Sequence, residues 1–224
     1  MGRDEIQVHG IGSLRRFSRT VEHQRRKPPS PPIPKGPVSL IRMRFNEAKA
    51  TQAAARLLRN RGGKMSYMKL IRLLYLADRE ALGQWGRTIT ADTYVSMDKG
   101  RVLSHVLDRI NEGPSPEDPS FWAQHITPSG NYEVTLTIDP NGDLLSEAED
   151  ELLDKIFKDH GHLSRWKMVD LVHTLPEWQN PDGGAIPINY ADILKAQMKD
   201  PDEIDAIVNE LNNLARIDEL CAPR

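Results

Sequence analysis

The stretch Tyr67-Met-Lys-Leu-Ile-Arg-Leu-Leu-Tyr-Leu-Ala-Asp78 decides the fold, because nine of its twelve residues are apolar or aromatic. The exceptions are Lys69, Arg72 and Asp78. A surface helix carries one apolar stripe, whereas a helix that is apolar on nearly all sides is buried. Twelve residues are too few for a membrane span, which needs about 20. The stretch therefore predicts the central helix of a helical domain.

The ends and the charges of this helix carry further expectations. Ser66 suits an N-cap, and Gly83 and Gly86 lie where the helix should end. Lys69 and Arg72 are three residues apart and share one side of the helix. Because a charge on a core helix needs a partner or a solvent edge, we expect both cations at an edge, paired with Asp78 or with a carboxylate of another helix.

The composition describes an acidic body with a basic extension. Residues 1–44 hold ten Lys/Arg and three Asp/Glu, a net charge of +7, whereas the remaining residues carry −9. A dedicated DNA-binding domain would place its basic residues on the folded part. The single cysteine, Cys221, excludes an internal disulfide. No apolar run of signal-peptide or membrane-helix length occurs, so we expect a soluble protein of the reducing cytoplasm.

The chain divides into three predicted parts. Residues 1–42 form a basic extension in which six of the sixteen prolines fall between Pro28 and Pro37, a run that is extended or disordered. It is a linker, a segment that precedes a true start at Met43, or an arm that binds a partner. Residues 43–200 form the main domain, and residues 201–224 form a C-terminal helix and tail.

Within the main domain, apolar periodicity and capping residues predict further helices. Ser146 and Glu149 form a capping box, and Asp200 and Pro201 form a cap and a first-turn proline. The predicted helices cover residues 46–59, 102–110, 146–159, 164–173, 190–198 and the segment from 201 onward.

Three β-rich segments interrupt the helices. Residues 88–95 are β-branched, and residues 122–126 and 132–138 are strand-like with a turn at 128–131 between them. The predicted fold class is therefore mainly α: a compact helical domain around a central buried helix, with a small β-hairpin insertion.

The sequence offers no catalytic or cofactor motif. It lacks a phosphate-binding glycine loop, an HExxH helix and a G-x-S-x-G elbow. His160, His162 and His173 are more typical of solvated or capping residues than of a metal site. His173 and Trp178 mark a helix-to-loop corner that is either core packing or a binding surface. We expect no metal, no cofactor and no enzyme activity.

Several of these features resemble one known family. The helix reads Lys69-Leu-x-x-Leu-Leu-Tyr-x-Ala-Asp78 and is followed by Thr90 and Tyr94. A capped leucine-rich helix comes later, and His173 precedes Trp178. This pattern resembles the Panacea domain, the SocA-like antitoxin family, over residues 46–200. The resemblance assigns a structural role to the motif residues Leu70, Leu73, Leu74, Tyr75, Asp78 and His173.

One departure stands out. Where the family has Gly-Pro-Val opening a helix, this chain reads Gly100-Arg101-Val102. We therefore expect Arg101 at a helix entrance, in the place of a first-turn proline.

The resemblance implies a type II antitoxin that binds and neutralises a cognate protein toxin by direct stoichiometric contact. Its partner would be a toxin such as a small alarmone synthetase-like enzyme, in a prokaryote or phage. Three alternatives stay open: an adaptor that delivers the toxin to a cytoplasmic protease, a nucleic-acid-binding regulator that uses the basic arm, and a hydrolase that uses His173 and an acidic residue. We expect no membrane partner. The candidate partner-binding residues are Lys69, Arg72, Tyr94, Arg101 and Trp178.

Overall fold

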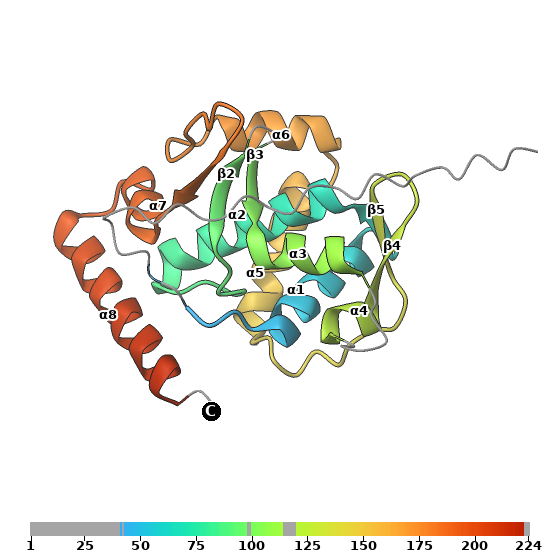
Figure 1. Ribbon diagram of the computed structural model, residues 1–224, viewed down its shortest axis with the longest axis horizontal. Coiled ribbons are helices and arrows are strands. Elements are labelled where there is room, and N and C mark those ends of the chain that lie inside the picture. The colour runs from blue at the N-terminus through green and yellow to red at the C-terminus, as the bar shows by residue number, and fades with distance from the viewer. Residues whose placement is uncertain (1–40, 42, 98–99, 114–119, 222–224) are drawn as a thin grey trace, which may run out of the picture.

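The central helix predicted from the sequence forms, and the other elements pack around it (Figure 1). The computed structural model describes residues 41, 43–97, 100–113 and 120–221. All of the basic extension except Ile41 lies outside these residues. The described part is mainly α with small strand elements, as predicted. The described helices are α1 (Glu47–Asn60), α2 (Tyr67–Trp85), α3 (Ser104–Glu112), α4 (Phe121–His125), α5 (Glu147–His160), α6 (Arg165–His173), α7 (Tyr190–Ala196) and α8 (Pro201–Leu220).

Two small antiparallel sheets flank the helices. One has the strand order β1-β5-β4 and the other β3-β2-β6. Each therefore joins a hairpin to a strand that is distant in sequence. The strands are β1 (Lys64–Ser66), β2 (Tyr94–Met97), β3 (Gly100–Leu103), β4 (Ile126–Ser129), β5 (Glu133–Leu136) and β6 (Ala185–Ile188).

Helix α2 is the centre of the hydrophobic core. Leu70, Leu73, Leu74 and Tyr75 are at most 1% exposed. The helix contacts α1, α3, α5, α6 and α7 as well as strands of both sheets. In Figure 1 it runs through the middle of the molecule, and α8 lies at the outer edge against α7. Among the described residues, no helix is both long and apolar enough to span a bilayer.

The predicted capping chemistry is largely present. The Ser146 hydroxyl accepts from the Glu149 amide, and the Glu149 carboxylate accepts from the Ser146 amide, completing the capping box of α5. Asp200 caps α8 with Pro201 in its first turn. Ser66 occupies the N-cap position of α2 but its side chain makes no capping hydrogen bond, and Gly86 ends α2 in the left-handed conformation that glycine tolerates best.

Three local predictions are wrong. The segment predicted as a strand at 122–126 is the helix α4, and its strand begins only at Ile126. Residues 88–93 form a loop, and the strand begins at Tyr94. Arg101 does not open a helix: it lies in β3, where it pairs with Ser96 of β2, and α3 begins at Ser104. The antiparallel pairing with β2 prevails over the helical spacing of Val102, since short apolar runs fit either structure.

Replacing Leu74 by alanine should destabilise the protein by about 2–5 kcal/mol, because the truncation leaves a cavity in the middle of the core. Urea denaturation measures the free energy of unfolding. Leu214→Ala is the matched control, since Leu214 is 41% exposed on α8 and should change stability by less than about 1 kcal/mol. Equal effects of the two substitutions would contradict the central position of α2.

Candidate functional site

Asp78, the last residue of the motif, holds the loop that follows α2. It is 1% exposed. Its Oδ1 accepts from the backbone N–H of Ile89 at 2.8 Å and of Thr90 at 3.0 Å. Its Oδ2 accepts from the Thr90 hydroxyl and from the Tyr94 hydroxyl, the latter at 3.0 Å. Four donors thus satisfy one buried carboxylate, which is what a buried charge requires.

Burial raises the pKa of Asp78 to about 6, while the hydrogen bonds from Thr90, Tyr94 and Ile89 pull it down. Burial also raises the pKa of Tyr94, and the neighbouring Asp78 charge adds to that effect. The tyrosine therefore stays a neutral donor to the carboxylate. These opposing effects identify Asp78 as a structural anchor whose protonation is coupled to folding.

Asp92 plays a similar part for α3. Its carboxylate accepts from the backbone N–H of Thr93, His105 and Val106 at 2.6–3.0 Å. It thereby caps the helix from a distant loop, although the formal N-cap, Leu103, has no capping side chain. The His105 imidazole lies 2.8 Å from the same carboxylate, and this hydrogen bond raises the pKa of His105.

Glu177 fixes the loop that follows α6. Its side chain is buried, and Oε1 accepts from the Tyr75 hydroxyl at 2.7 Å and from Arg79 Nε at 2.9 Å, both on α2. Trp178 then packs against His173, with ring centroids 4.6 Å apart and ring planes tilted by 33°. The corner containing His173 and Trp178 is therefore packed against the central helix.

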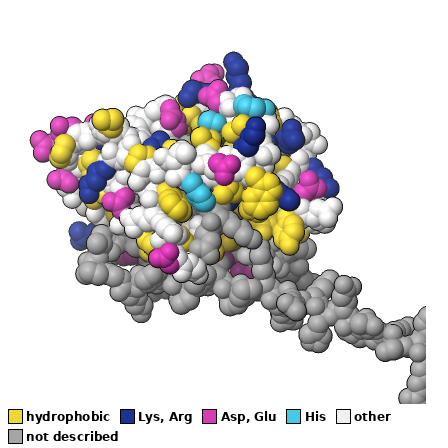
Figure 2. Space-filling view, turned by 90° about the horizontal axis from the view of Figure 1, so that it is seen from above, with side chains coloured by type: hydrophobic (Ala, Val, Ile, Leu, Met, Phe, Trp, Pro, Cys, Tyr) yellow, Lys and Arg dark blue, Asp and Glu magenta, His cyan; other side chains and the backbone are white. Residues whose placement is uncertain are grey.

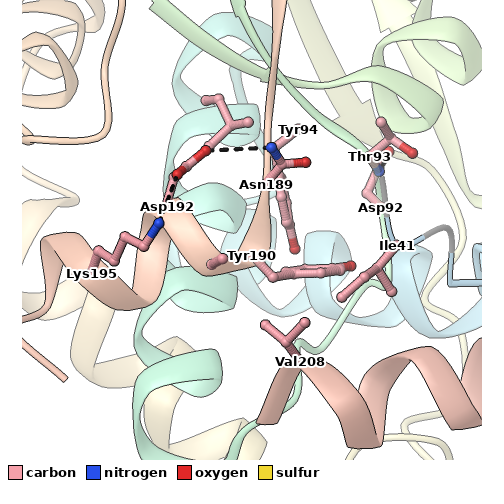
Figure 3. A pocket seen from close by; sticks show the side chains of 11 residues that line it. Ile41, Asp92, Thr93, Tyr94, Asn189, Tyr190, Asp192, Lys195 and Val208 are labelled. Atoms are coloured by element: carbon pink, nitrogen blue, oxygen red, sulfur yellow. Dashed lines mark hydrogen bonds and ion pairs between the residues drawn. The ribbon is translucent and has the colours of Figure 1, made fainter. Parts of the chain in front are cut away.

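A cavity of about 310 Å³ lies between β2, β6, α7 and α8 (Figure 3). Tyr94 and Tyr190 meet there edge to face at 5.7 Å, and Val208 of α8 faces Tyr190. The Asp92 carboxylate at its wall is already bound by backbone amides. The described lining thus combines apolar surface with polar groups that hold the fold together.

A second cavity, of about 240 Å³, lies at the start of α2. We call it the Lys69 hollow. Its charged lining consists of Arg61, Lys64, Lys69, Arg165 and Glu133. Its remaining lining residues are Met65, Ser66, Asn131, Leu163 and Ser164. The Lys69 ammonium donates to the carbonyl of Gly161, and burial, followed by the charge of Arg61, lowers the pKa of Lys69.

Comparison with known families matches residues 70–179 to the family described as antitoxin SocA-like, Panacea domain. Residues 70–179 carry a Panacea domain. No curated protein and no solved structure gives a significant match. The match begins within the α2 motif and ends just after Trp178, so it contains the anchors Asp78, Asp92 and Glu177. The family indicates an antitoxin role with a toxin as partner.

Within the Panacea domain, the motif residues are structural groups of the core. Leu70, Leu73, Leu74, Tyr75 and Asp78 are all buried. Asp78, however, binds the 89–94 loop, so the predicted pairing of Lys69 or Arg72 with Asp78 is wrong.

Of the five candidate partner-binding residues, Lys69, Arg72 and Tyr94 are buried and Trp178 is half-buried. Lys69 and Arg72 are 5% and 3% exposed, and Arg72 donates to the carbonyl of Met68 within α2. Their predicted position at a solvent edge is therefore wrong.

The other three candidates lie in different elements. Tyr94 is buried against Asp78, Trp178 is half-buried at the His173 corner, and Arg101 lies in the edge strand β3. Of these residues, Lys69 is the one that lines the basic hollow.

Sequence reasoning missed the groups that complete these sites. Arg79 follows Asp78 directly, and its spacing of four from Tyr75 places both on one helix face. Asp92 and Glu177 carried no recognisable signal, because each acts on a segment distant in sequence. Arg61 and Lys64 lie close to the start of α2 in the chain, but Arg165 reaches the hollow only through the fold.

Replacing Asp78 by alanine should destabilise the domain by about 2–6 kcal/mol, since two buried amide donors lose their acceptor at about 1–3 kcal/mol each. Asp78→Asn should cost much less, because the amide oxygen still accepts from Ile89 and Thr90. Urea denaturation near neutral pH compares the two variants. Equal losses would show that the negative charge, and not the acceptor geometry, holds the loop.

The Asp78 pKa predicts a pH effect of defined sign. The native carboxyl titrates near 6, against 3.8 for an ordinary aspartate, so within this window the native state keeps a proton that the unfolded chain loses. Raising the pH through the window should therefore lower the stability of the wild type relative to Asp78→Asn by up to about 3 kcal/mol. If the wild type instead gained stability relative to Asp78→Asn as the pH rises, the four hydrogen bonds would outweigh burial and the native pKa would lie below 3.8.

Proposed function

We propose that this protein is a type II antitoxin that binds a cognate protein toxin directly and neutralises it in a stoichiometric complex. The observation that carries the proposal is the Panacea match over residues 70–179. The buried network is consistent with it, because the charged groups of α2 are used to fix loops and not to present reacting atoms. The resemblance implies a protein toxin as the partner, and small alarmone synthetase-like enzymes are one class of toxin that such antitoxins neutralise.

The surface around the Lys69 hollow is the contact face that we propose. Tyr132 and Trp166 are 64% and 55% exposed and adjoin the hollow residues Asn131 and Arg165. Tyrosine, tryptophan and arginine are the residues most enriched at binding hot spots. Figure 2 shows hydrophobic side chains on the face seen from the α6 side, with Lys, Arg, His, Asp and Glu side chains among them.

The turn that presents Tyr132 has an uncommon backbone. Asn131 and Tyr132 both have φ of 62°, a left-handed conformation that costs non-glycine residues free energy and clusters at functional sites. The turn is held in place, because the Tyr67 amide at the start of α2 donates to the Tyr132 carbonyl at 3.0 Å. The backbone that carries the exposed ring is therefore attached to the start of the central helix, which favours a preorganised contact.

The test is co-expression with the product of the adjacent gene, followed by size-exclusion chromatography with light scattering and by a growth assay. The proposal expects a stable one-to-one complex and rescue of growth. Tyr132→Ala and Trp166→Ala should each weaken binding at least tenfold, about 1.4 kcal/mol, with an unchanged melting temperature.

Met198→Ala is the control, since Met198 is 93% exposed on a different part of the surface and should bind like the wild type. Rescue without a complex, accompanied by loss of the toxin from the cell, would indicate delivery to a protease. Toxicity that is unaffected by the wild-type protein, with no complex formed, would contradict the antitoxin assignment.

A further inference from the structure

We propose that the Lys69 hollow is an anion-binding site that receives an aspartate or glutamate side chain of the protein partner. This inference rests on the proposed function and specifies the chemistry of its contact. The site is built from one buried ammonium, two cations without ion pairs among the described residues, and the starts of two helices.

Lys69 provides the first argument. It is 5% exposed, and among the described residues its ammonium donates only to the Gly161 carbonyl and forms no ion pair. An ammonium has three N–H donors. A buried charge is ordinarily paired with an opposite charge, because its desolvation is otherwise uncompensated. The position of Lys69 thus leaves room for one negative group.

The rest of the lining has the same sign. Lys64 pairs with Glu133 at 2.9 Å. Arg61 and Arg165 form no ion pair within the described part of the chain. Four cations and one carboxylate give the lining a net charge of +3. The repulsion between Arg61 and Lys69, which contributes to the lowered pKa of Lys69, would be relieved by an anion.

Two helix starts add partial positive charge. Ser66 and Ser164, the N-cap residues of α2 and α6, both line the hollow. Ser164 caps α6 by accepting from the Lys167 amide. The buried Ser66 hydroxyl has no hydrogen-bond partner among the described residues, and α2 has no side-chain cap. Helix starts favour anions through their free N–H groups and the macrodipole.

The volume of the Lys69 hollow and the residues around it indicate which kind of anion binds there. The volume of about 240 Å³ is below the range of about 300–1,000 Å³ that is usual for small-molecule sites. It suits one carboxylate better than a whole nucleotide. The exposed Tyr132 and Trp166 beside it supply the aromatic contacts of a protein interface. We therefore assign the site to an acidic side chain of the toxin.

The first experiment measures the affinity for the adjacent gene product by isothermal titration calorimetry. Arg61→Gln and Arg165→Gln should each weaken binding about tenfold or more, and binding should become less sensitive to NaCl between about 0.05 and 0.3 M. Glu133→Gln should tighten binding, because it removes the one acidic group of the lining. Unchanged affinity in all three variants would overturn the proposal.

Two controls are matched by helix. Arg59→Gln lies on α1 near Arg61, and Arg59 pairs with Asp139 outside the hollow. Lys167→Gln lies on α6 two residues after Arg165, and Lys167 is exposed and does not line the hollow. Both should bind like the wild type. If the control variants lost as much affinity as the hollow variants, the effect would come from the overall charge of the protein, which would contradict a specific site.

The second experiment needs no toxin. Wild-type protein is titrated with a hexaglutamate peptide and, separately, with inorganic phosphate, while amide NMR shifts are followed. The peptide should shift the amides of Ser66, Lys69 and Ser164, and the Arg61→Gln/Arg165→Gln double variant should lose these shifts. Shifts from phosphate alone would assign a free anion in place of a partner carboxylate, and no shift with either probe would refute the site.

The two experiments separate the two claims. If the wild type binds no toxin but the peptide shifts the hollow amides, the antitoxin assignment is wrong and the anion site stands. If the toxin binds the hollow variants as tightly as the wild type and the peptide causes no shift, the anion site is wrong and the antitoxin assignment stands.

Discussion

The structure depends on one buried carboxylate, that of Asp78 near the middle of α2. The helix is surrounded by protein, so its polar groups must find partners inside the fold. Asp78 finds four donors on the segment from Ile89 to Tyr94. This binding determines where the chain leaves α2 and where β2 begins. A hydrophobic group at this position would pack in the core but would not define the path of that loop.

The other polar residues of α2 extend the same principle. Tyr75 and Arg79 hold Glu177, so that the loop after α6 is attached to the central helix. Most of the charge of α2 is thus used within the fold. Lys69 differs, because it lines the hollow at the start of α2 and forms no ion pair among the described residues. This position is the reason why we propose the start of α2 as the place where another molecule binds.

The sequence predicts the features that depend on local chemistry. The apolar run of α2, the Ser146 capping box and the Asp200 cap of α8 each lie within a few residues and were predicted correctly. The predicted strand segments contain β5 and the start of β2, whereas β1 and β6 were missed because they gain their partners from strands that are distant in sequence. The strand predicted from Thr88 fails for a different reason: the Asp78 carboxylate binds that backbone and turns it into a loop.

The residues of the candidate site also divide into one that the sequence predicts and others that only the fold brings together. Lys69 was identified from the sequence because a lysine in an apolar helix is unusual. Arg61 precedes Lys69 in the sequence, whereas Arg165 follows it far along the chain. No sequence pattern therefore links the two arginines to Lys69. The helix entrance predicted at Arg101 was wrong for a local reason, because Arg101 pairs with Ser96 in the hairpin of β2 and β3, and a short apolar run fits a strand as well as a helix. Capping and periodicity therefore define elements, whereas tertiary contacts define the site.

The central claim is that α2 is a rigid frame whose start carries the contact face for the partner. Hydrogen–deuterium exchange of the protein alone and with the adjacent gene product tests it most directly. The account predicts that amides at residues 70–82 are protected in both states, and that residues 61–69, 130–135 and 163–168 gain protection in the complex. Protection confined to α8 or to the loop after α6, with no change at the start of α2, would contradict it.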